Sequence, residues 1–253
     1  KVPEHIILID LSADFRLENF KEYEKWYNLK HQAKKLIKKS IYLLPELYSG
    51  DLKKYNIISC PGCYPTSIQL PLIPLIKKNY ILKNSIIIDS KSGYSGAGKN
   101  IEKKFKHKNL LNSLSAYGVG SHRHVPEIEQ ELCKAKKSNI NISFTPHLSP
   151  MFRGILSTIY LNLPPKVNAK KIYNCLKNFY LKSNFVKINK FNKAIGTGNV
   201  INTNYCNISV CENRQKNKII ILSAIDNLVK GGSGQAVQNM NKYFGFNESL
   251  GLK

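Results

Sequence analysis

The sequence predicts a mixed fold of helices and strands, of the α/β or α+β class. Short apolar runs typical of strands recur along the chain between longer segments with helical periodicity. The 253 residues, 42% of them hydrophobic, are enough to bury one large core or two smaller ones. No uninterrupted apolar run reaches the roughly 18 residues that a membrane-spanning helix needs.

Each expected element has its own pattern. Strands are predicted where apolar and β-branched residues cluster, at Ile6–Leu11, Asn56–Ser59, Ser85–Asp89, Ile140–Phe144, Leu156–Leu163, Ile208–Cys211 and Lys218–Ala224. Helices are predicted where apolar residues recur at helical spacing, at Leu17–Tyr27, Thr66–Lys78, Pro126–Lys136, Ala169–Tyr180 and Ser233–Phe244. The loops Lys91–Asn100, Val119–Glu127 and Thr145–Gly154 carry most of the unusual chemistry, and functional residues favour such positions.

The charge is strongly positive, with 39 Lys and Arg against 16 Asp and Glu, a net charge of +23. Nucleic-acid binding is one interpretation. However, the lysines are scattered, and the chain is rich in Lys, Asn and Ile, which favours compositional bias and solvated faces. We therefore expect no nucleic-acid partner and no membrane association. The opening apolar run is short and ends in Asp10, unlike a signal peptide, so we expect a cytoplasmic protein.

The most informative stretch is Ser59-Cys60-Pro61-Gly62-Cys63-Tyr64-Pro65-Thr66, between an expected strand and an expected helix. Pro65 suits a first helical turn, because its missing N–H would be unpaired there anyway. A thiol at such a junction faces the positive end of the helix, which favours the thiolate. Cys63 is the candidate nucleophile and Cys60 its rival. A redox pair or half of a zinc site stays open for Cys60-x-x-Cys63, although we expect no metal.

Two further loops carry polar groups suited to chemistry. The stretch from Asp89 to Lys99 is rich in Gly and Ser, so its backbone can approach an anion, but it matches neither a Walker A loop nor the Rossmann glycine spacing. The stretch from Gly120 to Glu129 holds His122 and His124, which point to the same side in extended chain. Either imidazole is a candidate proton carrier.

Two single residues complete the set of candidates. Arg153 can hold a carboxylate or phosphate through two parallel hydrogen bonds, or lie on the surface. Asn227, where a strand gives way to a glycine-rich bend, can bond an amide such as nicotinamide, or cap the turn.

Taken together, the segments resemble the N-acetyl-gamma-glutamyl-phosphate reductase family, within the semialdehyde dehydrogenase superfamily. The matching stretches, in family order, are Ile9–Leu17, Pro61–Thr66, Ser92–Gly98, His122–Ile128, Phe144–Leu148, Arg153–Leu156 and Asp226–Gln238. The resemblance implies the end of a Rossmann-type NADP-binding domain at 1–62. It further implies a glyceraldehyde-3-phosphate-dehydrogenase-like catalytic, substrate and oligomerisation domain at 63–227, and a C-terminal helix returning to the nucleotide domain at 228–253.

The resemblance also implies an activity, the third step of arginine biosynthesis. NADPH would reduce N-acetyl-glutamyl 5-phosphate to N-acetyl-glutamate 5-semialdehyde through a thioester on Cys63. His122 is favoured over His124 for the proton transfers. Arg153 and Glu127 are assigned to the substrate, with Glu127 orienting a histidine. Ser92, Gly93 and Asn227 are assigned to NADP(H). A homo-oligomer, dimer or tetramer, is expected.

Two departures from the family pattern limit this interpretation. Family members begin upstream, with a glycine-rich turn for the cofactor pyrophosphate, so the chain is expected to lack an N-terminal part. Leu43 stands where the family usually has glycine. An inactive remnant of the enzyme, without its nucleotide-binding half, is therefore the alternative function.

Overall fold

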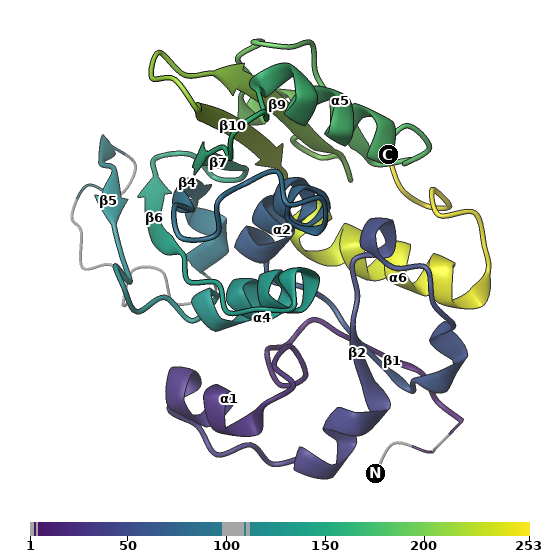
Figure 1. Cartoon of the computed structure of the whole chain (residues 1–253). Coiled ribbons are helices and arrows are strands. Elements are labelled where there is room, and N and C mark those ends of the chain that lie inside the picture. The colour runs from purple at the N-terminus through teal and green to yellow at the C-terminus, as the bar shows by residue number, and fades with distance from the viewer. Residues whose placement is uncertain (1–2, 4, 98–108, 110–111) are drawn as a thin grey trace.

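The computed structural model describes residues 3, 5–97, 109 and 112–253, and within them the strands form two sheets (Figure 1). The smaller sheet is parallel, in the order β1-β3-β2, with β1 at Leu8–Asp10, β2 at Ser40–Tyr42 and β3 at Ile57–Ser59. Helix α1 (Phe20–Tyr27) and a 3-10 turn at Lys34–Lys39 connect β1 to β2. Because all its strands are parallel, their carboxyl ends lie on the same edge, and β3 leads from that edge into the Cys60–Cys63 turn.

The larger sheet is mixed and has the order β5-β6-β4-β7-β10-β9-β8. Its strands are β4 (Ile87–Gly93), β5 (Ser115–Ala116), β6 (Ser143–Ser149), β7 (Ile155–Asn162), β8 (Val186–Ile188), β9 (Cys206–Glu212) and β10 (Lys218–Ile225). The pairs β4/β6 and β8/β9 are parallel and the other pairs antiparallel. One face packs on helices, while the other leaves Ile87 52% and Tyr160 40% exposed.

Helix α2 (Cys63–Lys77) lies in the middle of the molecule, against β7 and β10 (Figure 1). Its side chains from Tyr64 to Ile76 are all buried, as expected of a helix that is apolar on every side. Pro74 lies inside it and cannot donate to the carbonyl of Leu70 four residues earlier. The hydroxyl of Tyr180 donates to that carbonyl at 2.5 Å, which explains how the helix continues through the proline.

Helices α4 (Val125–Lys136) and α5 (Ala169–Phe179) and a π-helical turn pack against α2. Helix α4 packs along α2, and α5 packs on both α2 and β9. The chain then leaves β10 through this π-helical turn, at Val229–Ser233, and forms α6 (Gly234–Phe244), which contacts β1. The C-terminal segment therefore spans from the larger sheet to the smaller one.

Several predicted boundaries were wrong. Helix α2 begins at Cys63 rather than Thr66, so Pro65 is its third residue. Strands β4 and β6 continue to Gly93 and Ser149, into segments predicted as loops. Their small polar residues still alternate as a strand requires: Ser90 is buried and bonds Ser157 across the sheet at 2.7 Å. Gly98–Asn100, the end of the predicted loop Lys91–Asn100, lie outside the described residues.

The division of the chain into domains at residues 62 and 227 stays a prediction.

Among the described residues, no helix combines the length and the hydrophobicity needed to cross a membrane.

Candidate active site

The candidate nucleophile is the first residue of the central helix. Strand β3 ends at Ser59, and Gly62, in an extended conformation, precedes Cys63 and accepts the Thr66 N–H at 3.0 Å. A Cβ on Gly62 would lie 2.5 Å from Nε2 of His124 and 3.0 Å from Nη1 of Arg16. Only glycine therefore lets an imidazole and a guanidinium approach the backbone next to Cys63.

Cys63 opens onto a cavity of about 350 Å³. The cavity is lined by Trp26, Cys63, Tyr64, Ser92, Gly96, Tyr117, Gly118, Ser121, His122, Arg123 and His124. The fold thus brings Cys63, both candidate histidines and Ser92 to one cavity, from segments up to 61 residues apart in sequence (from Cys63 to His124). Arg153, Glu127, Gly93 and Asn227 do not line it.

The two imidazoles form an edge-to-face pair, with ring centroids 4.8 Å apart. The backbone N–H of His124 donates to Nδ1 of His122 at 3.2 Å, which makes Nδ1 the acceptor nitrogen of that ring. Burial, together with Arg123, lowers the pKa of His122 to about 4. Burial and the neighbouring His122 lower the pKa of His124 well below 6.5. Both rings are therefore neutral near pH 7 and can accept a proton.

The expectation that this junction favours the Cys63 thiolate was wrong for the protein without substrate. Burial raises the pKa of the Cys63 thiol, and the positive charge of Arg16 and nearby backbone N–H groups only partly oppose the rise. A neighbouring base is therefore needed to generate the nucleophile. Cys60, in turn, is fully buried, receives a hydrogen bond from Asn239 at 3.4 Å, and has its pKa raised by burial to about 11. Of the two thiols, Cys63 is the accessible one.

Glu127 lies behind the cavity wall and is fully buried. Its Oε1 accepts the Gly62 N–H at 2.7 Å and the Tyr42 hydroxyl at 2.9 Å, and its Oε2 lies 3.7 Å from Nη1 of Arg16. Its contacts are therefore with the turn before Cys63. The predicted roles toward a histidine and the substrate stay predictions.

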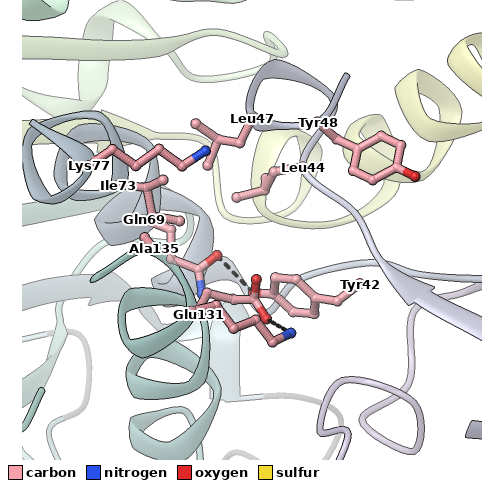
Figure 2. A pocket seen from close by; sticks show the side chains of 10 residues that line it. Tyr42, Leu44, Leu47, Tyr48, Gln69, Ile73, Lys77, Glu131 and Ala135 are labelled. Carbon is pink, nitrogen blue, oxygen red and sulfur yellow. Dashed lines mark hydrogen bonds and ion pairs between the residues drawn. The ribbon is translucent and has the colours of Figure 1, made fainter. Parts of the chain in front are cut away.

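Tyr42 links this buried carboxylate to a second pocket. Its hydroxyl also contacts Oε1 of Gln69 at 3.0 Å, and both side chains line a pocket of about 240 Å³ between β2, α2 and α4 (Figure 2). None of the predicted site residues lines this pocket, so the catalytic candidates concentrate at the Cys63 cavity.

The remaining candidates bind other parts of the protein. Arg153 pairs with the buried carboxylate of Asp226 at 3.1 Å and donates to Asn202. Asn227 accepts the Gly154 N–H at 2.6 Å and donates to Ser95 at 3.0 Å. A Cβ on Gly93 would lie 2.6 Å from the Phe152 carbonyl, so this glycine allows close backbone packing. Their assigned ligands stay predictions.

The cavity includes residues that sequence reasoning did not select: Trp26, Tyr117 and Arg123, with Arg16 behind them. Arg123 lies between the two histidines in the sequence, and a cation in that loop could have been recognised as a candidate site residue. Arg16 gave none, because its role arises from contacts with Cys60 and Leu11 carbonyls, both at 2.9 Å, that only the fold creates. Among the described residues, no group of three or more His, Cys, Asp or Glu is arranged to hold a metal ion.

Comparison with known proteins gives the same family as the sequence motifs. The family description "Semialdehyde dehydrogenase, dimerisation domain" matches residues 63–227. The chain is 46% identical over 247 residues to an N-acetyl-gamma-glutamyl-phosphate reductase of Clostridium novyi, covering 98% of this chain and 71% of that one. The chain belongs to the N-acetyl-gamma-glutamyl-phosphate reductase family. The predicted resemblance is thereby confirmed.

Other members of this reductase family show how much of a full-length relative the chain represents. A probable chloroplastic N-acetyl-gamma-glutamyl-phosphate reductase of Arabidopsis thaliana is 47% identical over 252 residues, which are 100% of this chain and 63% of the relative. The chain thus spans less than two thirds of the length of this plant relative.

Solved structures confirm the fold class. The structure of aspartate semialdehyde dehydrogenase II from Vibrio cholerae superposes with a TM-score of 0.66 at 16% identity. The match covers 93% of this chain and 71% of the Vibrio cholerae chain. The aspartate semialdehyde dehydrogenase from Francisella tularensis matches 81% and 71% with a TM-score of 0.64 at 12% identity. At such low identity these matches establish the fold alone, in agreement with the predicted α/β plus α+β architecture.

Proposed function

We propose that the chain carries the catalytic part of an enzyme that reduces N-acetyl-glutamyl 5-phosphate to N-acetyl-glutamate 5-semialdehyde, with release of phosphate. The observation that carries this proposal is the cavity shared by Cys63, His122 and His124. The names of the relatives indicate the substrate, and the cavity supplies a nucleophile with neutral bases beside it.

The first half of the proposed reaction uses only residues of this chain. A neutral imidazole accepts the Cys63 proton, and the sulfur attacks the acyl carbon. The S–C bond forms, the C–O bond to phosphate breaks, and phosphate leaves with the bonding electron pair. Backbone N–H groups in the first turn of α2, which have no partners within the helix, stabilise the oxyanion. The product of this half is a thioester on Cys63.

We assign the proton transfer to His124, although His122 was favoured from sequence. The support is that Nε2 of His124 lies against Gly62, the residue adjoining Cys63, whereas Nδ1 of His122 is engaged by the backbone N–H of His124. The lowered pKa of His124 makes its imidazolium a strong acid. Once protonated, it returns the proton to the Cys63 sulfur as the C–S bond of the reduced intermediate breaks and the oxyanion becomes the carbonyl of the departing aldehyde.

We propose that the nicotinamide end of NADPH binds at the end of this cavity near Ser92. A Cβ on Gly96 would lie 2.9 Å from Oγ of Ser92 and 3.5 Å from Nδ2 of Asn227, so the bare glycine leaves open a space beside a hydroxyl and an amide. We assign Ser92 and Asn227 to the nicotinamide end of the cofactor. When bound there, NADPH supplies the hydride that reduces the thioester.

Arg123 is the guanidinium best placed for the anionic substrate. It lines the cavity and is exposed, whereas Arg153 is already paired with Asp226. We therefore assign the substrate phosphate or carboxylate to Arg123. Arg123→Gln is expected to raise the KM for the acyl phosphate more than tenfold, while Arg153→Gln chiefly lowers stability.

We also propose that a second copy of the chain packs on the open face of the larger sheet. The support is the description of the matching family as a dimerisation domain, together with the exposed Ile87 and Tyr160 on that face. Tyr160→Glu should convert the dimer or tetramer to monomer in light scattering. An unchanged mass would remove this face from consideration.

The test of the function is turnover in the reverse direction, in which N-acetyl-glutamate semialdehyde and phosphate reduce NADP. Cys63→Ala should abolish it, while Cys60→Ser should retain most of it. Equal loss in both variants would favour a redox pair instead. If the unaltered chain neither turns over nor changes its Trp26 fluorescence on addition of NADPH, the inactive remnant is the correct interpretation. Trp26 lies on the cavity wall and is therefore a suitable reporter.

A further inference from the structure

A buried ion pair lies outside the cavity, between two segments that flank the nucleophile. The Lys230 side chain is 0% exposed and that of Glu46 is 2% exposed, and the ammonium lies 2.6 Å from Oε1 of Glu46. Gln238 of α6 joins them, accepting from Lys230 at 2.7 Å and donating to Glu46 at 3.0 Å. The three side chains come from the turn after β2, the π-helical turn and α6.

Stability alone is a weak explanation for this pair. The desolvation of two buried charges offsets much of their attraction, and apolar residues of similar volume are often as stable or more so. Such a pair does, however, fix the relative position of its two backbones, because either charge left without the other is strongly unfavourable. The relevant question is what the backbone of Lys230 contacts.

Gly231, the residue after Lys230, packs directly against Cys63. A Cβ on Gly231 would lie 2.6 Å from Cβ of Cys63 and 3.1 Å from its Cα. The Gly231 N–H bonds the Asp226 carbonyl at 2.9 Å, and Gly232 departs from helical geometry. The backbone of the π-helical turn therefore forms the wall behind the Cys63 side chain, opposite the cavity.

A second contact from the same segment supports the turn that precedes Cys63. Nδ2 of Asn239, next to Gln238, donates to the Leu43 carbonyl at 3.3 Å and to Sγ of Cys60 at 3.4 Å. Both ends of the Cys60–Cys63 turn are thus held from residues 231–239, and the segment around Glu46 is held by the same network.

We propose that the Lys230–Glu46 ion pair is a positioning device that holds Gly231 against Cys63 and so keeps the sulfur directed into the cavity. Lys230 and Glu46 do not line the cavity and are shielded from solvent, so their effect on Cys63 is indirect, through the backbone of Gly231. The part of this proposal that concerns turnover rests on the proposed function, whereas the part that concerns the position of the thiol does not.

The test compares Lys230→Met with the double variant Glu46→Leu/Lys230→Met in the full chain. Lys230→Met leaves the buried Glu46 carboxylate without its counter-charge, and we expect this to lower the melting temperature. The double variant removes both charges, and Gln238 keeps Asn204 at 2.9 Å and Glu248 at 3.2 Å as partners, so most of the melting temperature should return. Lys242→Met, which removes a partly exposed ion pair between Lys242 of α6 and Glu248, is the control.

The readout is the rate at which iodoacetamide alkylates Cys63, mapped by mass spectrometry, alongside kcat and KM. We expect the double variant to alkylate Cys63 at least threefold more slowly and to lose at least tenfold in kcat with KM within twofold, although it is stable. Wild-type rates in the double variant would show that the pair serves stability only and would overturn the proposal. Slower alkylation in a chain without turnover would support the positioning role while removing the proposed function.

Discussion

Removal of the Glu127 carboxylate should be among the most destabilising single changes in the chain. Glu127→Leu takes away the acceptor of the Gly62 N–H and one of the two acceptors near the Tyr42 hydroxyl, and it leaves Arg16 without its counter-charge. These groups come from the turn before Cys63, from β2 and from the segment after β1. The change therefore tests whether one buried carboxylate holds these segments together.

The size of the effect follows from the contacts. Breaking a buried ion pair from one side costs about 3–5 kcal/mol. The lower end applies here, because Arg16 lies 3.7 Å from Glu127 and keeps its bonds to the carbonyls of Cys60 and Leu11. At about 2–4 °C per kcal/mol for a chain of this size, a loss of about 3 kcal/mol lowers the melting temperature by about 6–12 °C.

Two matched variants separate charge from shape and position. Glu127→Gln keeps an oxygen for Gly62 but loses the charge, so it should cost about 1–2 kcal/mol, the difference between charged and neutral hydrogen bonds. Glu131→Leu, one turn along α4, removes an ion pair with Lys134 that is partly exposed, and should cost no more than about 1 kcal/mol.

The assay is urea unfolding followed by Trp26 fluorescence, supported by calorimetry. A loss below about 1 kcal/mol for Glu127→Leu would refute the reasoning, since stranded buried donors cost about 1–3 kcal/mol each. Equal losses for the Gln and Leu variants would show that the lost charge accounts for the whole effect and that the oxygen retained by Gln contributes nothing.

Three further predictions follow from single contacts. Gly62→Ala should fold but lose most turnover, because its Cβ would displace the His124 ring, and a kcat within twofold of wild type would contradict that geometry. The pKa of His122 is about 4 when folded and 6.5 when unfolded, so between these values the unfolded chain binds the extra proton and stability falls as the pH falls from 6.5. His122→Asn should reduce this dependence in urea unfolding at pH 7 and pH 5, leaving the part that His124 contributes, and an unchanged slope would exclude His122 as a source. Tyr180→Phe should destabilise by about 1–3 kcal/mol through the stranded Leu70 carbonyl, and a neutral effect in the same assay would show that α2 tolerates Pro74 without that hydroxyl.

The sequence predicted the elements with strong periodicity and the Cys63 turn. Apolar spacing and proline placement are local signals, so helices such as α4 and α5 were located closely. Strand β4 was cut short because its later residues, from Ser90 to Gly93, are small or polar, and β6 was cut short because Pro146 and His147 interrupt its apolar pattern. Ser90 is buried through a hydroxyl contact across the sheet with Ser157, which no local pattern reveals.

The site was predictable to the extent that its residues lie in motifs. Cys63, His122 and His124 share a cavity as the loop chemistry indicated. The partners of Arg153 and Glu127 were not predictable, because Asp226 and Gly62 approach them only after long-range folding. The raised pKa of Cys63 was missed for a similar reason: burial, which only the fold creates, outweighs the effect of the nearby backbone N–H groups and of Arg16.

The most direct test of the account is to trap the acyl group on the protein. The chain is incubated with N-acetyl-glutamyl 5-phosphate in the absence of NADPH, quenched in acid, digested and analysed by mass spectrometry. The account predicts an acyl adduct on the peptide that carries Cys63, released by hydroxylamine and absent from Cys63→Ala. An adduct on Cys60, or reduction of the acyl phosphate by Cys63→Ala at the wild-type rate, would contradict it.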